Sequence, residues 1–220
     1  MKRIFTLAFA LSLLSAVTAQ EKKVYTTSGA EGAILSFSQV QRNGNTLNSA
    51  GRFTIFFHAG TNLHYDFSEN AGFFTGINIK NIGIIHDDGA NTRYKRRVYT
   101  VGVPVALKFG NLEKRNFGYL GAEANLAINY KEKQFVNGDR VSKFNDWFSN
   151  RTPLFMPAVF AGVHTKNGIG LKFQYYLNNF LNPDFSTNNV KPYAGMDAKV
   201  FYVTLGYDFD IKNDFKKKRK

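Results

Sequence analysis

The stretch YTVGVPVALKF at residues 99–109 decides the fold, because its side chains alternate in character with a period of two. Its odd positions carry only large apolar side chains, and its even positions carry Thr100, Gly102, Pro104, Ala106 and Lys108. Successive side chains of a β-strand point to opposite faces. The stretch therefore predicts a strand with one apolar face and one small or polar face.

The same alternation recurs along the chain. It is clear in the segments 53–67, 120–130, 169–177 and 201–211. Three more segments are less regular. The segment 33–37 is short, and the segment 154–165 is apolar on both faces. In the segment 73–85 the alternation changes phase near Asn81 and Ile82, as it would at a β-bulge. Together these segments predict an antiparallel sheet of about eight strands.

The connections between these segments differ in length at the two ends of the sheet. Those at 67–72, 110–116 and 165–168 are short, and those at 41–52, 86–97, 131–152 and 178–198 are long. Short turns at one end and long loops at the other are typical of outer-membrane barrels. The predicted fold class is therefore all-β: an eight-stranded antiparallel transmembrane β-barrel with short periplasmic turns and long extracellular loops.

A soluble lipocalin-like calyx, a periplasmic carrier of an apolar ligand, is the main alternative, because it shows the same alternation. The polar faces favour the membrane barrel, since their glycines and charged side chains suit a narrow lumen. Aromatic residues also gather at both ends of the apolar faces, as in the girdles at lipid–water boundaries. The predicted strands, at roughly 10–14 residues, are long enough to cross a membrane when tilted.

The two ends of the chain are set apart from the predicted barrel at 20–211. Residues 1–19 are interpreted as a cleaved signal peptide, with Lys2 and Arg3 before an apolar stretch and a small-residue site ending at Ala19. Residues 212–220 form a basic periplasmic tail that contributes to the formal charge of +13. The expected location is the outer membrane, and the absence of cysteine excludes disulfides and thiolate sites.

Three short motifs resemble recurring strand motifs of the PorT-like outer-membrane β-barrel family of Gram-negative bacteria. They are VPVALKF at 103–109, YYLNNF at 175–180 and LGYDF at 205–209. The resemblance implies a small barrel in the outer membrane, and it implies no catalytic residues.

Charged residues on the predicted strands and loops are the candidate functional groups. A lumen charge network is expected from Lys80, Lys108 and Lys172 facing Glu123, Asp208 and Asp210. Contact with lipopolysaccharide phosphates is expected from Arg93, Lys95, Arg96 and Arg97. Such a filled barrel is predicted to be non-enzymatic, with a structural, assembly or interaction role.

The loops 131–152 and 178–198 are the candidate segments for a protein partner, through Phe135, Phe144, Trp147, Phe148, Phe180, Phe185 and Tyr193. A further alternative is a surface hydrolase that uses His86, Asp87 and Asp88, the cluster in the sequence with general-base potential. No cofactor and no metal site is expected, because His58 and His64 are about 20 Å apart along one strand. A nucleic-acid partner is not expected for an exported chain despite its basic charge.

Overall fold

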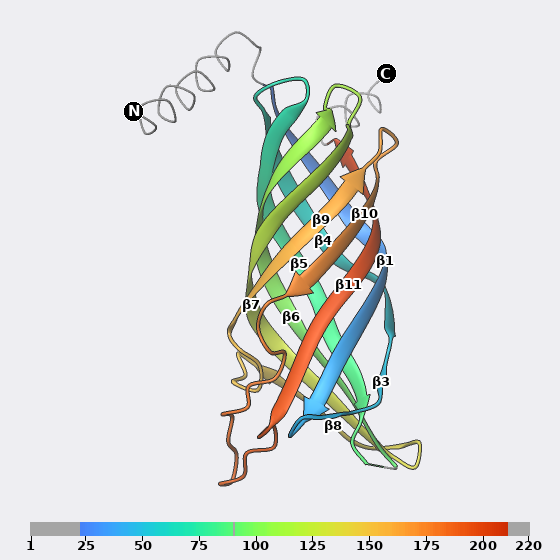
Figure 1. The fold of residues 1–220 in the computed structure, drawn as a ribbon, viewed down its shortest axis with the longest axis vertical. Helices are drawn as coiled ribbons and strands as arrows, with labels where there is room; N and C mark the ends of the chain where they lie inside the picture. Colours follow the sequence, from blue (N-terminus) through green and yellow to red (C-terminus); the bar gives the residue numbers. More distant parts are fainter. Residues whose placement is uncertain (1–22, 90, 211–220) are drawn as a thin grey trace, which may run out of the picture.

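The computed structural model describes residues 23–89 and 91–210, which form one ring of antiparallel strands (Figure 1). Eight strands make the ring in the order β11-β10-β9-β7-β6-β5-β4-β1, and β1 pairs with β11 to close it. Their bounds are β1 Lys23–Arg42, β4 Arg52–Asp66, β5 Ala71–Asp87, β6 Thr92–Asn111, β7 Asn116–Val136, β9 Phe155–His164, β10 Ile169–Tyr176 and β11 Met196–Asp210.

Three further strands are not members of the ring; they lie at the end of the barrel that carries the long connections. The short β2 (Asn45–Thr46) pairs with β1, and β3 (Ser49–Ala50) pairs with β5. The longer β8 (Asp139–Trp147) pairs with the part of β7 that extends beyond β9. Within the described ranges there is no helix with the length and apolar character that a membrane crossing needs.

The apolar rows of the strands point away from the axis of the ring. On β6, Val105 and Phe109 are 57% and 50% exposed, whereas Thr100 and Lys108 are 0% exposed. The same large exposed side chains recur around the ring, for example Leu63, Ile77, Leu120, Val163, Leu171 and Leu205. The alternation predicted from residues 99–109 is therefore present with its apolar face outward, which is the arrangement of a transmembrane barrel.

Several strands are longer than the sequence predicted. The expected short strand at 33–37 is the centre of a strand of 20 residues, whose first half lacks an apolar row. The expected loops at 86–97 and 131–152 are largely strand, because β5, β6, β7 and β8 continue as hairpins past the apolar band. On these extensions charged side chains point alternately into the lumen and outward. The segments were expected to be loops because they are charged and lack an apolar row.

The bulge expected near Asn81 and Ile82 is wrong. The pairing of β5 with β6 keeps one register from Ala71 to Asp87. Ile82 and Ile84 are each 1% exposed and point inward. The apolar residues change phase because the lumen itself becomes apolar toward the long-loop end. The register shifts of this region lie in other strand pairs: between Glu31 and Ala33, where β1 pairs with β4, and between Tyr99 and Thr100, where β6 pairs with β7.

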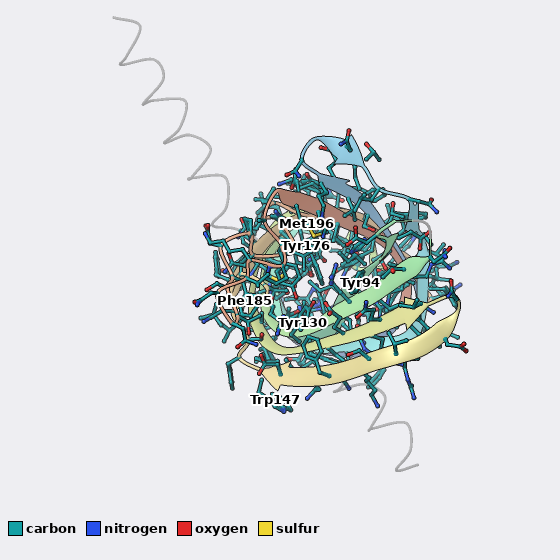
Figure 2. The ribbon with its side chains drawn as sticks, turned by 90° about the horizontal axis from the view of Figure 1, so that it is seen from below. Tyr94, Tyr130, Trp147, Tyr176, Phe185 and Met196 are labelled. Atoms are coloured by element: carbon teal, nitrogen blue, oxygen red, sulfur yellow. The ribbon has the colours of Figure 1, made fainter. Side chains whose placement is uncertain are left out.

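The long-loop half of the interior is packed with apolar side chains. Figure 2 shows Tyr130, Tyr176 and Met196 inside the ring, with Trp147 on its outside. The segment between β10 and β11 adds Phe180, Leu181 and Tyr193, which are at most 1% exposed and join this core. The expectation that Phe180 and Tyr193 are available to a partner is therefore wrong, because they close the mouth of the barrel.

Two of the predicted segments, the signal peptide at 1–19 and the tail at 212–220, lie outside the described residues.

Candidate functional site

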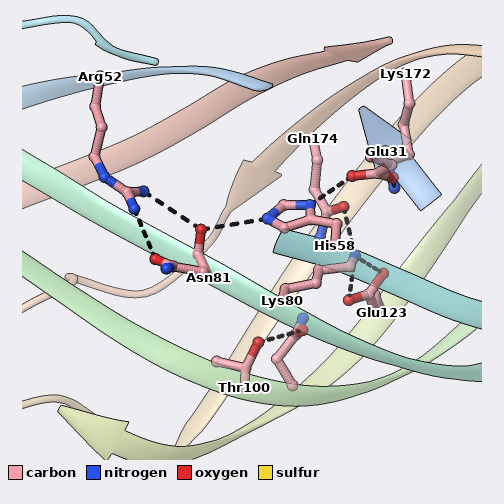
Figure 3. Close-up of polar contacts among 10 residues, drawn as sticks. Glu31, Arg52, His58, Lys80, Asn81, Thr100, Glu123, Lys172 and Gln174 are labelled. Carbon is pink, nitrogen blue, oxygen red and sulfur yellow. Dashed lines mark hydrogen bonds and ion pairs between the residues drawn. The ribbon is translucent and has the colours of Figure 1, made fainter. Parts of the chain in front are cut away.

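A buried ion pair crosses the middle of the lumen (Figure 3). The ammonium group of Lys80 lies 2.6 and 2.5 Å from the two carboxylate oxygens of Glu123, and 3.0 Å from the amide oxygen of Gln174. Both charged side chains are 2% exposed. The alternation of β5 and β7 places these residues on inward faces, and both strands flank β6, so their side chains meet above it. Gln174 reaches Lys80 from β10, on the other side of the ring.

A second charged group lies beside this pair. Lys172 of β10 forms an ion pair with Glu31 of β1, and Nδ1 of His58 lies 2.5 Å from the other oxygen of the same carboxylate. The sequence pointed to Lys172 but missed Glu31, because the first half of β1 shows no apolar alternation. The lumen charges therefore interlock side chains from strands that are far apart along the chain.

A third charged group closes the short-turn end of the lumen. Lys108 pairs with Asp66 and donates to the hydroxyl of Tyr25 at 2.9 Å, so Asp208 is not its partner. Asp208 instead contacts His164 and lies 3.2 Å from the guanidinium of Arg115. The side chain of Asp210 lies outside the described residues.

A cavity of about 140 Å³ with a mixed polar and aromatic lining separates the charges in the middle of the lumen from those at the short-turn end. Its lining includes Glu31, Lys80, His164 and Asp208, and the side-chain oxygen of Asn78, which lacks a hydrogen-bond partner. The described part of the lumen is thus occupied by apolar packing and ion pairs, with one small cavity between them.

The three residues of the possible hydrolase site do not converge. The imidazole of His86 points inward and is 0% exposed, with Nε2 against Arg96. Asp87 binds Arg93, and this hydrogen bond lowers the pKa of the Asp87 carboxyl. Asp88 binds Arg42, 2.7 Å away. Each carboxylate is held by its own arginine, and the ring of His86 contacts Arg96 and the backbone oxygen of Asp87 rather than either carboxylate. In the described chain no three His, Asp or Glu side chains gather where they would hold a metal ion.

Arg96 points into the barrel, so its expected role in contacting lipopolysaccharide is wrong. Its Nε lies 2.5 Å from Glu132, and its guanidinium lies over the ring of Tyr94 at 4.2 Å. The residue is 4% exposed. Its inward direction follows from the alternation, because Arg96 has the parity of Thr100 and Lys108, which also face the lumen.

Arg93, Lys95 and Arg97 do point outward, and they belong to a larger group of cations. Strand pairing places Arg97 opposite Lys131, Lys95 opposite Lys133, and Lys133 opposite Lys143. We call this group the basic surface; it spans the outer faces of β6, β7 and β8 beyond the apolar band, and its members are Arg93, Lys95, Arg97, Lys131, Lys133, Arg140 and Lys143. Lys131 and Lys133 could have been predicted from the alternation if the strand expected at 120–130 had been continued to residue 136.

Only Arg93 of the basic surface forms an ion pair with a carboxylate of the described chain. Lys95 and Lys131 instead lie over the rings of Phe135 and Tyr99, at 4.8 and 6.0 Å. The pKa of Lys133, above the apolar band, is lowered by slight desolvation and then by its cationic neighbours, which include Arg97, Arg140, Lys143 and Lys95. Apart from Arg93, the surface therefore concentrates positive charge without an ion-paired carboxylate among the described residues.

The strand ring and its outward apolar rows define the class of protein: an eight-stranded antiparallel transmembrane β-barrel of the outer-membrane type.

The sequence matches no family model and no curated protein. Among solved structures, the chain is similar to Neisserial surface protein A, with 14% identity over 87% of this chain and 100% of the other, at a TM-score of 0.40. It is also similar to Ail of Yersinia pestis, solved in complex with the heparin analogue sucrose octasulfate: 14% identity, 86% and 100% coverage, and a TM-score of 0.35. A third is the outer membrane protein OprG from Pseudomonas aeruginosa: 13% identity, 84% and 96% coverage, and a TM-score of 0.32.

Proposed function

We propose that this chain is an integral outer-membrane protein without enzymatic activity, which acts as a structural, assembly or interaction protein through its extracellular end. One observation carries the proposal: the apolar rows face outward on a closed ring whose interior is filled by side chains. A ring with such an exterior is stable in lipid, and a filled interior of this kind leaves no path for general diffusion.

The alternative of a soluble carrier does not fit this geometry. A carrier of an apolar ligand needs its large apolar side chains around an internal cavity. Here Val103, Leu107 and Phe173 are 47–48% exposed on the outside. The apolar half of the interior is packed, and the cavity of about 140 Å³ is small and has charged groups such as Glu31, Lys80 and Asp208 among its aromatic lining residues.

The alternative of a surface hydrolase also lacks support. His86, Asp87 and Asp88 bind three different arginines and point in different directions. General-base catalysis needs the base within hydrogen-bond reach of the group that it activates, with an orienting partner behind it. Their arrangement instead fits a hairpin turn that is held in place by ion pairs with arginines.

Lipopolysaccharide and outer-membrane lipid are the proposed partners, through the basic surface, and the exposed Trp147 and Phe148 are the aromatic residues offered to lipid or a protein partner. Export by the predicted signal peptide at 1–19, the barrel at 20–211 and the basic tail at 212–220 belong to the same proposal. Membership of the PorT-like family stays a prediction.

Cell fractionation together with conductance measurements tests this proposal. We expect the protein only in the detergent-soluble outer-membrane fraction, and we expect the purified barrel to give no stable open channel in a planar bilayer. Recovery from the soluble periplasm without detergent, or a constant large conductance, would contradict it.

A further inference from the structure

We propose that the basic surface is a binding site for lipid A, the phosphorylated glycolipid of lipopolysaccharide, and that its lysines neutralise the lipid phosphates in place of divalent cations. This inference rests on the proposed function, since it requires the long-loop end of the barrel to face the outer leaflet.

The strand register provides the first argument. Lys95, Lys133 and Lys143 stand directly opposite one another on three adjacent strands. Cβ atoms of directly opposite residues are only about 4.5–5.5 Å apart, and like charges in such positions destabilise a sheet. A second cationic pair, Arg97 with Lys131, lies in the next row. Such a ladder is stable when an anion lies across it.

The missing carboxylates provide the second argument. The lysines of the lumen are each paired with a carboxylate: Lys80 with Glu123, Lys108 with Asp66, and Lys172 with Glu31. On the basic surface only Arg93 has such a partner among the described side chains. The other six are left for an external anion: Lys95, Arg97, Lys131, Lys133, Arg140 and Lys143.

The position of the surface identifies the anion as a lipid headgroup. The outward row of β6 runs from Phe109 through Val103 to Tyr99, and Arg97 and Lys95 continue it without a break. Two residues along a strand span about 7 Å, so Arg97 lies about 7 Å beyond Tyr99, the last aromatic residue of the row. On β8, the exposed Trp147 lies at the same boundary, opposite Asn129. Headgroup phosphates lie at this level, just above the acyl chains.

The number of cations favours a glycolipid with two phosphate groups over a phospholipid. A phosphate monoester carries about −1.5 to −2 charges at pH 7, so two of them supply roughly −3 to −4. A phosphodiester headgroup brings a single phosphate and leaves most of the six unpaired cations uncompensated. The two rows of opposed cations also reach phosphates at separate positions along one headgroup.

Binding of lipid A to the full-length barrel in detergent micelles tests the inference. The variant K95Q/K133Q/K143Q removes the central ladder, and K114Q/K166Q/K191Q removes the same charge from exposed positions elsewhere. We expect the first variant to lose about 100-fold in affinity for bisphosphorylated lipid A, roughly fivefold for each cation. The second variant should bind like the wild type. Binding by the wild type should persist in excess EDTA and should be weaker for monophosphoryl lipid A.

Equal binding by both triple variants would overturn the inference. So would loss of wild-type binding in EDTA, since divalent ions would then bridge the phosphates, or equal affinity for phosphatidylglycerol micelles. Thermal unfolding of each variant checks that the barrel is intact, and the single variant K133Q repeats the test if the triple variant does not fold. A barrel that fractionates with the outer membrane and gives no channel, yet binds no lipid A, refutes this inference alone.

Discussion

Removal of one partner of the buried ion pair is the most informative change in the interior. In the variant Lys80→Met, the carboxylate of Glu123 loses both close contacts to the ammonium group, at 2.6 and 2.5 Å. The carboxylate side chain is only 2% exposed, so bulk solvent compensates little of this loss. An uncompensated buried charge of this kind costs about 3–5 kcal/mol.

The double variant K80M/E123Q should regain most of this loss, because it removes the isolated charge and keeps the shape of the side chain. The exposed control Lys114→Met should change the free energy of unfolding by less than about 0.5 kcal/mol. The assay is urea unfolding in lipid vesicles, followed by the electrophoretic mobility shift of the folded barrel and extrapolated linearly to zero urea. A wild-type stability for Lys80→Met would refute the idea that this pair is desolvated, and equal losses for the single and double variants would refute the charge argument.

Three further changes probe other parts of the barrel. Gly102→Ala places a Cβ atom 2.5 Å from Glu123 Oε1, so we expect a loss of about 1–3 kcal/mol in the same unfolding assay; no loss would mean that the network yields freely. Val105→Arg, at a position 57% exposed, should cost about 2–4 kcal/mol in lipid vesicles, whereas a water-facing position would tolerate it within 0.5 kcal/mol. Phe180→Ala, at a side chain 1% exposed, should loosen the segment between β10 and β11 by about 3 kcal/mol. It should accelerate protease cleavage within residues 182–195, and an unchanged rate would argue against a packed lid.

The alternation of apolar residues was sufficient to predict the ring, because lipid on one side and a polar lumen on the other impose a period of two. It was insufficient where the two faces of a strand do not differ in polarity. After Val24 and Tyr25, the first half of β1 has only small and polar residues on both faces, so its strand, and Glu31 with it, was missed. Toward the long-loop end the lumen turns apolar, and Ile82 and Ile84 were mistaken for a slip in phase.

Partners across the lumen could not be predicted, because they depend on which strands ring closure brings together. Lys172 and Glu31 are 141 residues apart in sequence, and Lys80 and Gln174 are 94 apart. Arg96 is a different case. Its parity was visible in the sequence, and the assumption of a loop at 86–97 concealed it.

The direction of the apolar rows is the central claim, and the absence of cysteine makes it directly measurable. Single cysteines at Val103, Pro104, Val105 and Ala106 of β6 would carry a fluorophore, in vesicles with brominated acyl chains. We predict strong quenching at Val103 and Val105 and weak quenching at Pro104 and Ala106. Quenching in the opposite phase, or equal quenching at all four positions, would contradict an apolar face turned toward lipid.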